Sequence, residues 1–395
     1  MSVDPIVIVG AARTAMGGLM GDFATLTAPE LGAAAVRAAV ERAGVTPEEI
    51  EEVVMGCVLQ AGQGQAPGRQ AALHGGLPQS VPATTINKMC GSGMKAAMMV
   101  HDLIKAEAIG IGLAGGMESM SSAPYLLDKA RGGYRLGHGK VTDHMFLDGL
   151  EDAYDKGRLM GTFAEECAQF YQFTRDAQDA YALESLRRAK DAIETQKFAA
   201  EITPVTVKGR KGDVQIAQDE QPLKAMPEKI PTLKPAFAKD GTVTAANSSS
   251  ISDGAAALVL MRQSEADRRG LKVLARIVGH ASHAQAPNLF TTAPVGAMRK
   301  LLEKTGWHAR DVDLYEVNEA FAVVTMAAMR ELDLPHDKVN VHGGACALGH
   351  PIGASGARVL VTLLNALERY DLKRGVASLC IGGGEATAMA VERVH

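Results

Sequence analysis

The sequence lacks several features that mark whole classes of protein. Its apolar run at residues 320–329 is too short to span a bilayer. The N-terminus has no basic segment followed by a long hydrophobic stretch, so we expect no signal peptide, and neither end carries a lipidation or retention motif. The formal net charge of −4 and the pI of about 6.3 argue against nucleic-acid binding by overall charge.

Cysteine is scarce and shows no pairing pattern. The five cysteines, at positions 57, 90, 167, 346 and 380, are odd in number, widely spaced and free of any C-x-x-C pair. This argues against a disulfide framework and predicts a reducing, cytoplasmic setting. The 395 residues suffice for two or three domains, and 47% hydrophobic with 22% charged residues is ordinary for a globular protein.

Short apolar runs alternate with helical patterns along the chain. We expect buried strands near residues 6–9, 53–59, 109–113, 312–317 and 376–381. Helices are expected at 29–43, from 69, from Cys90 to about 106, at 175–194 and at 357–369. This alternation predicts an α/β fold with buried strands.

Two parts of the chain have similar sequence patterns. Each pattern of strands and helices ends in a similar glycine-rich motif, GLAGGMESM at 112–120 and CIGGGEATAM at 380–389, which predicts a diverged internal duplication. Residues 122–243 are richer in charge and proline and look like an insertion laid across the first half. We therefore divide the chain into a first half (1–121 with 244–270), an inserted domain (122–243) and a second half (271–395).

Cys90 lies in TINKMCGSGMK, residues 85–95, where a helix is expected to begin. The positive end of the helix dipole and the free N–H groups there favour a thiolate. Gly91 and Gly93 would let a bulky group come close to the backbone. A free cysteine is also often an inert part of a core, so the motif alone leaves both interpretations open.

His350 and Cys380 lie in two further glycine-rich stretches, GHPIGASG (349–356) and SLCIGGG (378–384). Pro351 disfavours helical backbone at His350, so we expect a loop histidine that can act as a base near neutral pH. A loop histidine with satisfied hydrogen bonds is the alternative. Cys380 follows an apolar strand, and ligands of α/β sheets bind at strand ends; the alternative is a buried structural thiol.

Asn318 begins the stretch NEAF, 318–321, after an expected strand. It either caps the following helix or holds a water and donates to an oxyanion. His342, Cys346 and His350 stand four residues apart, as zinc ligands on a helix do. Glycines and a proline interrupt this segment, so the three side chains should not share a face, and we expect no metal site.

Taken together, these stretches resemble the thiolase family over essentially the whole chain. The motifs NKMCGSGMKA, GGMESMSSAPY, GRKGD, SDGAAALVLM, NEAFA, GHPIGASGAR and CIGGGEA occur in the family's order and spacing. The resemblance implies two βαβαβαββ halves in a five-layered αβαβα core, with a loop domain inserted into the first half. It also implies acyl exchange between thioesters by a ping-pong route.

The resemblance assigns a role to each reactive residue. Cys90 becomes S-acylated and His350 takes its proton. Cys380 removes the α-proton of acetyl-CoA in synthesis, or protonates the leaving enolate in cleavage. Asn318 holds a water that forms one oxyanion hole with His350, and the backbone N–H groups of Cys90 and Gly382 form the other. Losing one such donor costs about 3 kcal/mol in comparable sites.

The resemblance also implies where coenzyme A (CoA) and the acyl group bind. The implied CoA contacts are Leu150, Met160, Phe237, Ala246, Ser249 and Phe321, and Phe290 lies beside the acyl pocket. A flexible turn is the alternative for the serine, and a plain core for the phenylalanines. The basic clusters available for the phosphates, which are usually just solvated faces, are Lys129, Arg131, Arg135 and Lys140, and Lys208, Arg210 and Lys211. CoA thioesters are then substrates, and no cofactor is expected.

The sequence departs from the family pattern in four places. Biosynthetic members usually have a histidine at the position of Leu159 and a methionine-glycine pair at Phe290-Thr291. At the position of His342 the family more often has an asparagine, and at the position of Cys346 it more often has an aliphatic residue. No catalytic group is lost, but Leu159 and Phe290 bear on the acyl-chain preference.

The segment RGGYRLGHGKVTDHM, 131–145, resembles the tetramerisation loop of short-chain thiolases. We therefore expect a homotetramer, a dimer of dimers, with edge strands of the first half paired across the tighter dimer. The expected activity is that of an acetyl-CoA C-acetyltransferase, which condenses two acetyl-CoA to acetoacetyl-CoA and CoA, or cleaves the product. No nucleic-acid or membrane partner is expected.

Three alternatives compete with this activity. A 3-ketoacyl-CoA thiolase of fatty-acid β-oxidation would prefer longer chains. A catalytically dead acyl-CoA binder should have lost Cys90, His350 or Cys380, and all three are present. A ketoacyl synthase pairs one cysteine with two histidines, but Cys380 stands where the first of those histidines is expected.

Overall fold

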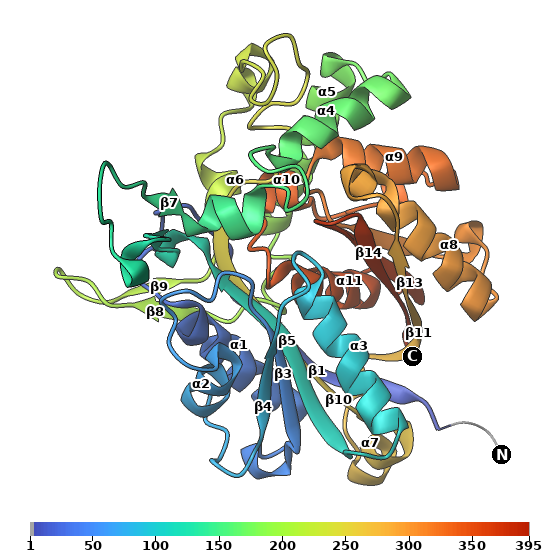
Figure 1. Ribbon diagram of the computed structural model, residues 1–395. Helices are drawn as coiled ribbons and strands as arrows, with labels where there is room; N and C mark the ends of the chain where they lie inside the picture. Colours follow the sequence, from blue (N-terminus) through green and yellow to red (C-terminus); the bar gives the residue numbers. More distant parts are fainter. Residues whose placement is uncertain (1–3, 395) are drawn as a thin grey trace.

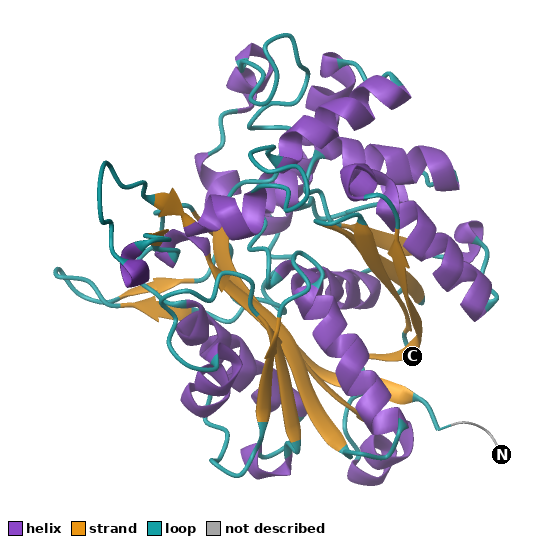
Figure 2. Cartoon of the chain, viewed as in Figure 1, coloured by secondary structure: helices purple, strands orange, loops and turns teal. Residues whose placement is uncertain are grey.

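The computed structural model describes residues 4–394, and its core has five layers, helix–sheet–helix–sheet–helix (Figures 1 and 2). The first half supplies five strands in the order β4-β3-β5-β10-β1. β3 is parallel to β4 and β5, and β10 is antiparallel to β5 and β1. The strands are β1 Ile6–Arg13, β3 Glu52–Gly56, β4 Ala83–Ile86, β5 Ile111–Ser119 and β10 Ser252–Arg262, with the short β2 Gly17–Gly18 beside β10. The helices are α1 Ala28–Ala43, α2 Pro67–His74, α3 Ser92–Lys105 and α7 Gln263–Arg269.

The second half repeats this arrangement. Its strands run β12-β13-β14-β11, with β12 parallel to β13, and β14 antiparallel to β13 and β11. Val339 forms an isolated parallel bridge with Tyr315 at the place that β4 occupies in the first half. The strands are β11 Ala275–Ala284, β12 Leu314–Val317, β13 Arg374–Ile381 and β14 Glu385–Glu392. The helices are α8 Ala293–Thr305, α9 Ala322–Leu332, α10 Ala345–Leu348 and α11 Ser355–Arg369. The matching order confirms the predicted duplication and the five-layered fold.

Helices α3 and α11 form the middle layer and pack against each other between the two sheets. Each is apolar over most of its surface, as a helix buried on several sides requires. Helices α1 and α2 cover the outer face of the first sheet, and α8 and α9 that of the second. A short pairing of β1 with β11, through Val7 and Ile8, joins the two sheets into one.

Local signals account for the best-defined helix ends. The Glu30 carboxylate accepts the backbone N–H of Thr27 at 2.8 Å, which closes a capping box at the start of α1. Gly44 ends the helix with φ of 68°, a left-handed conformation that glycine adopts without a steric penalty. Both ends agree with the helix predicted at 29–43.

The segment 122–243 forms helices and hairpins that touch both halves. Helix α4 packs on α9, and α5 packs on α9 and α10, so the helices cover the second half rather than the first, and the predicted position was wrong in this respect. The link to the first half is a buried ion-pair group in which Arg13 contacts Glu201 at 2.5 Å and Asp219 at 2.7 Å. The elements are β6 Tyr125–Leu126, β7 Thr142–Asp143, α4 Met160–Tyr171, α5 Arg175–Glu194, β8 Val205–Val207, β9 Val214–Ile216 and α6 Glu220–Lys224.

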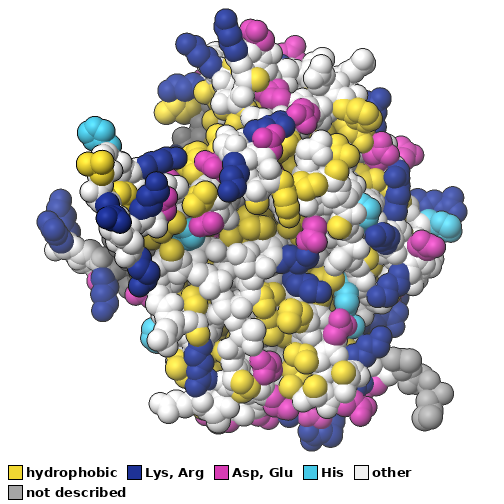
Figure 3. All heavy atoms as spheres, in the orientation of Figure 1, with side chains coloured by type: hydrophobic (Ala, Val, Ile, Leu, Met, Phe, Trp, Pro, Cys, Tyr) yellow, Lys and Arg dark blue, Asp and Glu magenta, His cyan; other side chains and the backbone are white. Residues whose placement is uncertain are grey.

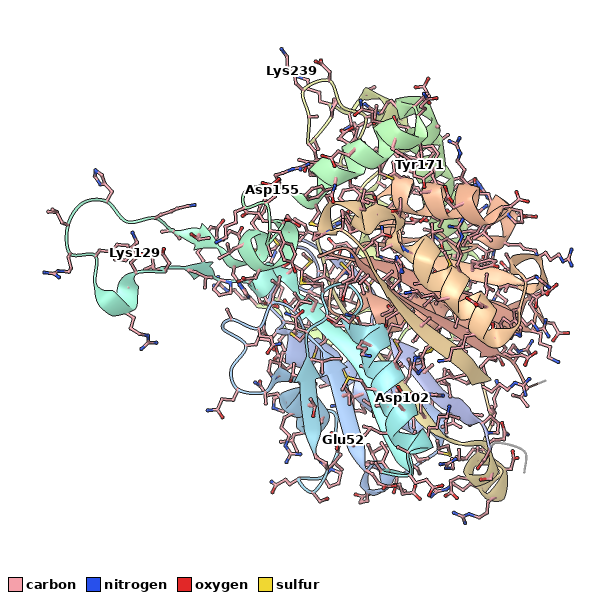
Figure 4. The ribbon with its side chains drawn as sticks, turned by 45° about the vertical axis from the view of Figure 1, so that its right-hand side comes forward. Glu52, Asp102, Lys129, Asp155, Tyr171 and Lys239 are labelled. Carbon is pink, nitrogen blue, oxygen red and sulfur yellow. The ribbon has the colours of Figure 1, made fainter. Side chains whose placement is uncertain are left out.

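Two segments of this region project from the body of the protein. One is the arm at 127–141, on which Figure 4 labels Lys129, and the other is the β8–β9 hairpin. Figure 3 shows Lys and Arg side chains gathered on both, and these include the two predicted basic clusters. Leu136 at the tip of the arm is 97% exposed. Over residues 4–394, none of the helices combines the length and apolar character that a membrane crossing needs.

Candidate active site

One cavity of about 410 Å³ gathers most of the predicted site. It lies where α3, the loop before α11 and the end of β13 meet the inserted domain. The predicted residues that line it are Cys90, Leu150, Met160, Phe237, Ser249, Phe290, Phe321, His350 and Gly382. Its lining is mainly apolar, with a few polar groups, as is usual for sites that bind organic ligands.

Cys90 is half-buried and lies in a sharp turn between β4 and α3. Met89, just before it, has φ of 47°, a strained conformation for a residue with a side chain. Ser92 holds the turn, because its hydroxyl donates to the Met89 carbonyl at 2.6 Å and accepts the Lys88 N–H at 2.8 Å. The turn presents the thiol to the cavity at the N-terminus of α3.

The glycines beside Cys90 serve packing rather than ligand approach. A Cβ on Gly91 would lie 2.3 Å from the Ile381 side chain, and one on Gly93 would lie 2.6 Å from the Ala357 backbone. These positions need glycine because α3 touches the end of β13 and helix α11. The bulky groups that approach Gly91 and Gly93 are therefore parts of the protein itself. This close packing brings Cys90 near β13, the strand that carries Cys380.

The Cys90 thiol is neutral in the free protein. Burial raises its pKa to about 11, although the backbone N–H groups of Gly382 and Cys90 act in the opposite direction. The predicted preference for a thiolate at the helix N-terminus was therefore wrong for the free protein, because desolvation outweighs the backbone N–H groups. Thiolate must therefore form by proton transfer during the reaction.

Alkylation kinetics check this state of the thiol. Below a pKa of about 11 the thiolate fraction rises about tenfold per pH unit, so we expect the rate of Cys90 modification by iodoacetamide to rise about 100-fold from pH 7 to pH 9. Peptide mapping identifies the modified residue. A rate that is already constant across this range would indicate a preformed thiolate and would contradict the assignment.

His350 lies in a loop after Gly349, as predicted, and its imidazole is 5% exposed. Burial, with a smaller contribution from Arg358, lowers its pKa to about 3, so the ring is neutral. The Ser355 hydroxyl donates to the Pro351 carbonyl at 3.0 Å and lies 2.6 Å from the ring Nδ1. Because this hydroxyl has one hydrogen, it accepts from Nδ1–H, which leaves Nε2 as the free base.

Ser355 is a positioning residue that the sequence analysis missed, although it lies in the quoted motif GHPIGASG. In Ser355→Ala we expect kcat to fall roughly tenfold with little change in KM, because one hydrogen bond of about 1 kcal/mol fixes the ring tautomer. Steady-state kinetics over a pH series measure this. A fall in thermal stability with unchanged kcat would assign Ser355 a purely structural role.

Asn318 does not cap a helix, because α9 begins at Ala322, four residues further along the chain, and Phe321 is at its N-cap position. Its side chain is fully buried, and Nδ2 lies 3.4 Å from Nε2 and 3.5 Å from Nδ1 of His350. These similar distances place the amide beside the ring. Its Oδ1 is buried without a hydrogen-bond partner in the protein, which fits an atom that binds a water or a substrate.

Cys380 is the next-to-last residue of β13 and is 1% exposed, behind the cavity wall rather than among the lining residues. Burial raises its pKa well above the ordinary value, and the charge of Cys90 raises it further. That coupling indicates that the two sulfurs are close. The Gly382 N–H, two residues on, acts to lower the pKa of Cys90 and so lies near its sulfur.

Glu118 is a second residue that the sequence analysis missed. Its fully buried carboxylate accepts backbone N–H groups from Val58, Leu59 and Gly353 at 2.8–3.0 Å. Burial raises its pKa to about 7 despite these bonds. Glu118 thereby ties the His350 loop to the loop after β3. Its place in the motif GGMESM was a signal that went unused.

Most residues predicted to contact CoA line the main cavity. Ser249 donates its hydroxyl to the Ala320 carbonyl at 2.9 Å, beside Phe321. Phe290 packs edge-on against Phe163 and Phe321, with centroids 6.3 and 6.4 Å apart. Ala246 instead lines a neighbouring cavity of about 360 Å³, and Ala245 takes its place in the main one.

The neighbouring cavity is lined by two lysines, Lys224 and Lys229, that the sequence analysis did not single out. The basic clusters predicted on the arm and on the β8–β9 hairpin line neither cavity. Lys224 is ion-paired with Glu220. Leu159, at the histidine position of the family, lines the main cavity.

The side chains of His342, Cys346 and His350, which have zinc-like spacing in the sequence, lie in three different environments. His342 Nε2 lies 3.1 Å from the Tyr370 hydroxyl, and its ring contacts Phe198. The Cys346 sulfur lies 3.7 Å from the Glu319 carbonyl. His350 lies in the active-site loop, so the interrupted helix separates the three as predicted.

Comparison with known proteins gives the family. Residues 6–264 match the model of the thiolase N-terminal domain, and residues 271–393 match that of the thiolase C-terminal domain. The chain belongs to the thiolase family. The two matches divide this thiolase close to the point where the second structural repeat begins at β11.

Named relatives are similar over almost the full length of this thiolase. The acetyl-CoA acetyltransferase of Escherichia coli is 50% identical over 391 residues, which cover 98% of this chain and 99% of that protein. The crystal structure of the Bacillus anthracis acetyl-CoA acetyltransferase superposes with a TM-score of 0.96 at 42% identity, with 99% of each chain covered. The Ascaris suum Acat5 thiolase, in complex with coenzyme A, gives 0.93 at 40% identity over 99% of this chain and 100% of that one.

Proposed function

We infer that this thiolase is an acetyl-CoA C-acetyltransferase, an acyltransferase that condenses two acetyl-CoA to acetoacetyl-CoA and CoA and catalyses the reverse cleavage. The full-length similarity to enzymes of that name favours it over the longer-chain alternative. The observation that carries the mechanism is the meeting of Cys90, His350 and the Gly382 backbone in one cavity, with Cys380 directly behind.

The first half-reaction transfers an acetyl group to Cys90. His350 Nε2 takes the thiol proton, the sulfur attacks the thioester carbon, and a tetrahedral oxyanion forms. The C–S bond to CoA then breaks, and the departing CoA thiolate takes the Cys380 proton. The products are S-acetyl-Cys90, protonated His350 and a Cys380 thiolate.

The second half-reaction forms the carbon–carbon bond and restores the protons. The Cys380 thiolate is a strong base because burial raises its pKa, and it removes the α-proton of a second acetyl-CoA. The resulting enolate carbon attacks the acyl carbon on Cys90. The Cys90 sulfur leaves and recovers its proton from His350, so the protein ends as it began.

Two sets of donors stabilise the negative oxygens. The backbone N–H groups of Cys90 and Gly382 bind one oxyanion, and both already act to lower the pKa of the Cys90 thiol. Asn318 and His350 bind the other through a water, which the partnerless Oδ1 of Asn318 accommodates. We propose that the acyl transfer itself uses no metal and no cofactor beyond the CoA thioesters.

CoA spans both cavities in this proposal. The pantetheine arm lies between Met160, Phe237 and Ser249 in the main cavity, and the phosphates reach towards Lys229 in the neighbouring one. The acyl group meets Phe290, whose bulk favours short chains. The measurement that tests the function is the rate of thiolysis of four-carbon ketoacyl-CoA against eight- to sixteen-carbon ones. Preference for the long chains would contradict it.

Phe290 sets the chain-length limit. In Phe290→Ala we expect kcat/KM for a six-carbon ketoacyl-CoA to rise roughly tenfold relative to the four-carbon substrate, because two more CH₂ groups are buried at about 0.8 kcal/mol each. Competition assays with both substrates measure the ratio. Phe170→Ala, at a position 79% exposed, is the control. An unchanged ratio would place the limit elsewhere.

We also propose a cytoplasmic homotetramer. β4 ends the first sheet with an unpaired edge, which suits strand pairing across a dimer. The exposed apolar side chains of the 127–141 arm suit a second contact between dimers. The division of the chain at residues 121, 243 and 270 remains part of this proposal.

A further inference from the structure

Two histidines and an aspartate meet outside the active-site cavity. His101 and Asp102 lie near the C-terminal end of α3, and His280 lies in the middle of β11. Figure 4 labels Asp102 on α3, where the helix passes the second half of the protein. Over residues 4–394, this is the one group of three or more histidine, cysteine or acidic side chains close enough to hold a metal ion.

The three side chains point at a common centre. Asp102 Oδ1 lies 2.9 Å from His101 Nδ1 and 2.9 Å from His280 Nε2. All three donor atoms lie within 4.8 Å of one another, and the two rings are perpendicular with centroids 5.0 Å apart. Ligand atoms that bond to one ion at 2.0–2.2 Å lie roughly 3.3–3.6 Å apart, so the Asp102 carboxylate has to move outward from both nitrogens to admit an ion.

The surroundings combine rigid ligands with access from solvent. The side chains of His101 and His280 are 10% and 13% exposed, whereas that of Asp102 is 57% exposed and can rotate towards an incoming ion. Lys105 and Lys304 are the cations that act on the two rings, and the Lys304 ammonium donates to the His280 carbonyl at 3.1 Å.

We propose that His101, Asp102 and His280 form a binding site for a divalent transition-metal ion of the Zn²⁺ class. Imidazole and carboxylate ligands suit such ions, and three protein ligands leave the remaining positions to water. The site is separate from the acyl-transfer chemistry, because none of its residues lines the cavity that contains Cys90.

A bound ion would join the two halves of the protein. Helix α3 starts two residues after Cys90, and β11 leads to Gln285, whose N–H donates to the Gly384 carbonyl at 2.8 Å. The two elements therefore lead to Cys90 and to the glycine loop 382–384, which contains Gly382. The expected role is to hold these elements together, so metal should raise thermal stability.

The test uses metal-free, untagged full-length protein in which Cys90→Ala removes the accessible thiol. We expect calorimetry to give one Zn²⁺ per chain and a higher melting temperature. Co²⁺ should give a spectrum without thiolate charge-transfer bands. His280→Gln and Asp102→Asn should each weaken Zn²⁺ binding roughly tenfold or more. Removing a residue that only hydrogen-bonds to a metal ligand already lowers metal affinity about 10–100-fold, and these two variants change the ligands themselves.

His283→Gln, three residues along the same strand, is the matched control and should leave binding unchanged. Asp102→Asn keeps the hydrogen-bond acceptor at an exposed position, so it should fold even if a histidine variant does not. Absence of stoichiometric binding, or equal binding by Asp102→Asn, would overturn the proposal. The trio would then be a hydrogen-bonded link in which both imidazoles donate to one carboxylate.

Discussion

Cys90→Ala should abolish acetyl transfer. We expect kcat to fall on the order of 10⁴-fold or more, as when a covalent enzyme loses its nucleophile. After mixing with acetyl-CoA, intact-mass analysis should show one added acetyl group on the native protein and none on the variant. The reason is that no other thiol lines the main cavity among the described residues.

Cys167→Ala is the matched control for this experiment. Cys167 is buried in the apolar cluster that also contains Cys380, and burial raises its pKa to about 11, the value given for Cys90. Loss of this thiol should leave acetylation intact. An acetyl group that persists on Cys90→Ala would assign the nucleophile to another residue.

Cys380→Ala should separate the two half-reactions. We expect the variant still to accept an acetyl group on Cys90, because a thiolate is a good leaving group and CoA can take its proton from water when Cys380 is absent. Condensation should fall about 10²–10⁴-fold, the usual contribution of a general acid–base group. Deuterium exchange from the acetyl-CoA methyl group, followed by mass spectrometry, should fall in parallel, because Cys380 takes the α-proton. The same Cys167→Ala variant controls for loss of a buried thiol.

Two outcomes would refute this role. Condensation at the native rate would mean that another base removes the α-proton. Equal loss of acetylation and condensation would mean that Cys380 only supports the fold around Cys90. The geometry favours a chemical role, because the charge on one sulfur raises the pKa of the other.

The fold followed from the sequence where local pattern and tertiary environment agreed. Helix α1 carries its own capping box and terminal glycine, so its ends could be predicted within one residue. The position of the insertion could not, because α4 and α5 are amphipathic and their partners, α9 and α10, come more than 100 residues later. Periodicity identifies an apolar face but not the surface that covers it.

Some residues of the candidate site could also be predicted from the sequence, and others could not. Cys90, His350 and Cys380 stood out because glycine and proline isolate them in the sequence. Ser355 and Glu118 did not, because their importance lies in hydrogen bonds to a ring nitrogen and to three separate backbone groups. The roles of Gly91 and Gly93 were also hidden, since their close neighbours are Ile381 and Ala357.

The sequence by itself determined the α/β class, the duplication and the candidates for the reactive side chains, because these depend on residue type and order along the chain. Only the tertiary structure decided their protonation, since desolvation at Cys90 outweighs the helix N-terminus. It alone brought His280 to Asp102, which lies 178 positions away in the chain. Burial and long-range proximity are properties of the packed molecule, and no local pattern encodes them.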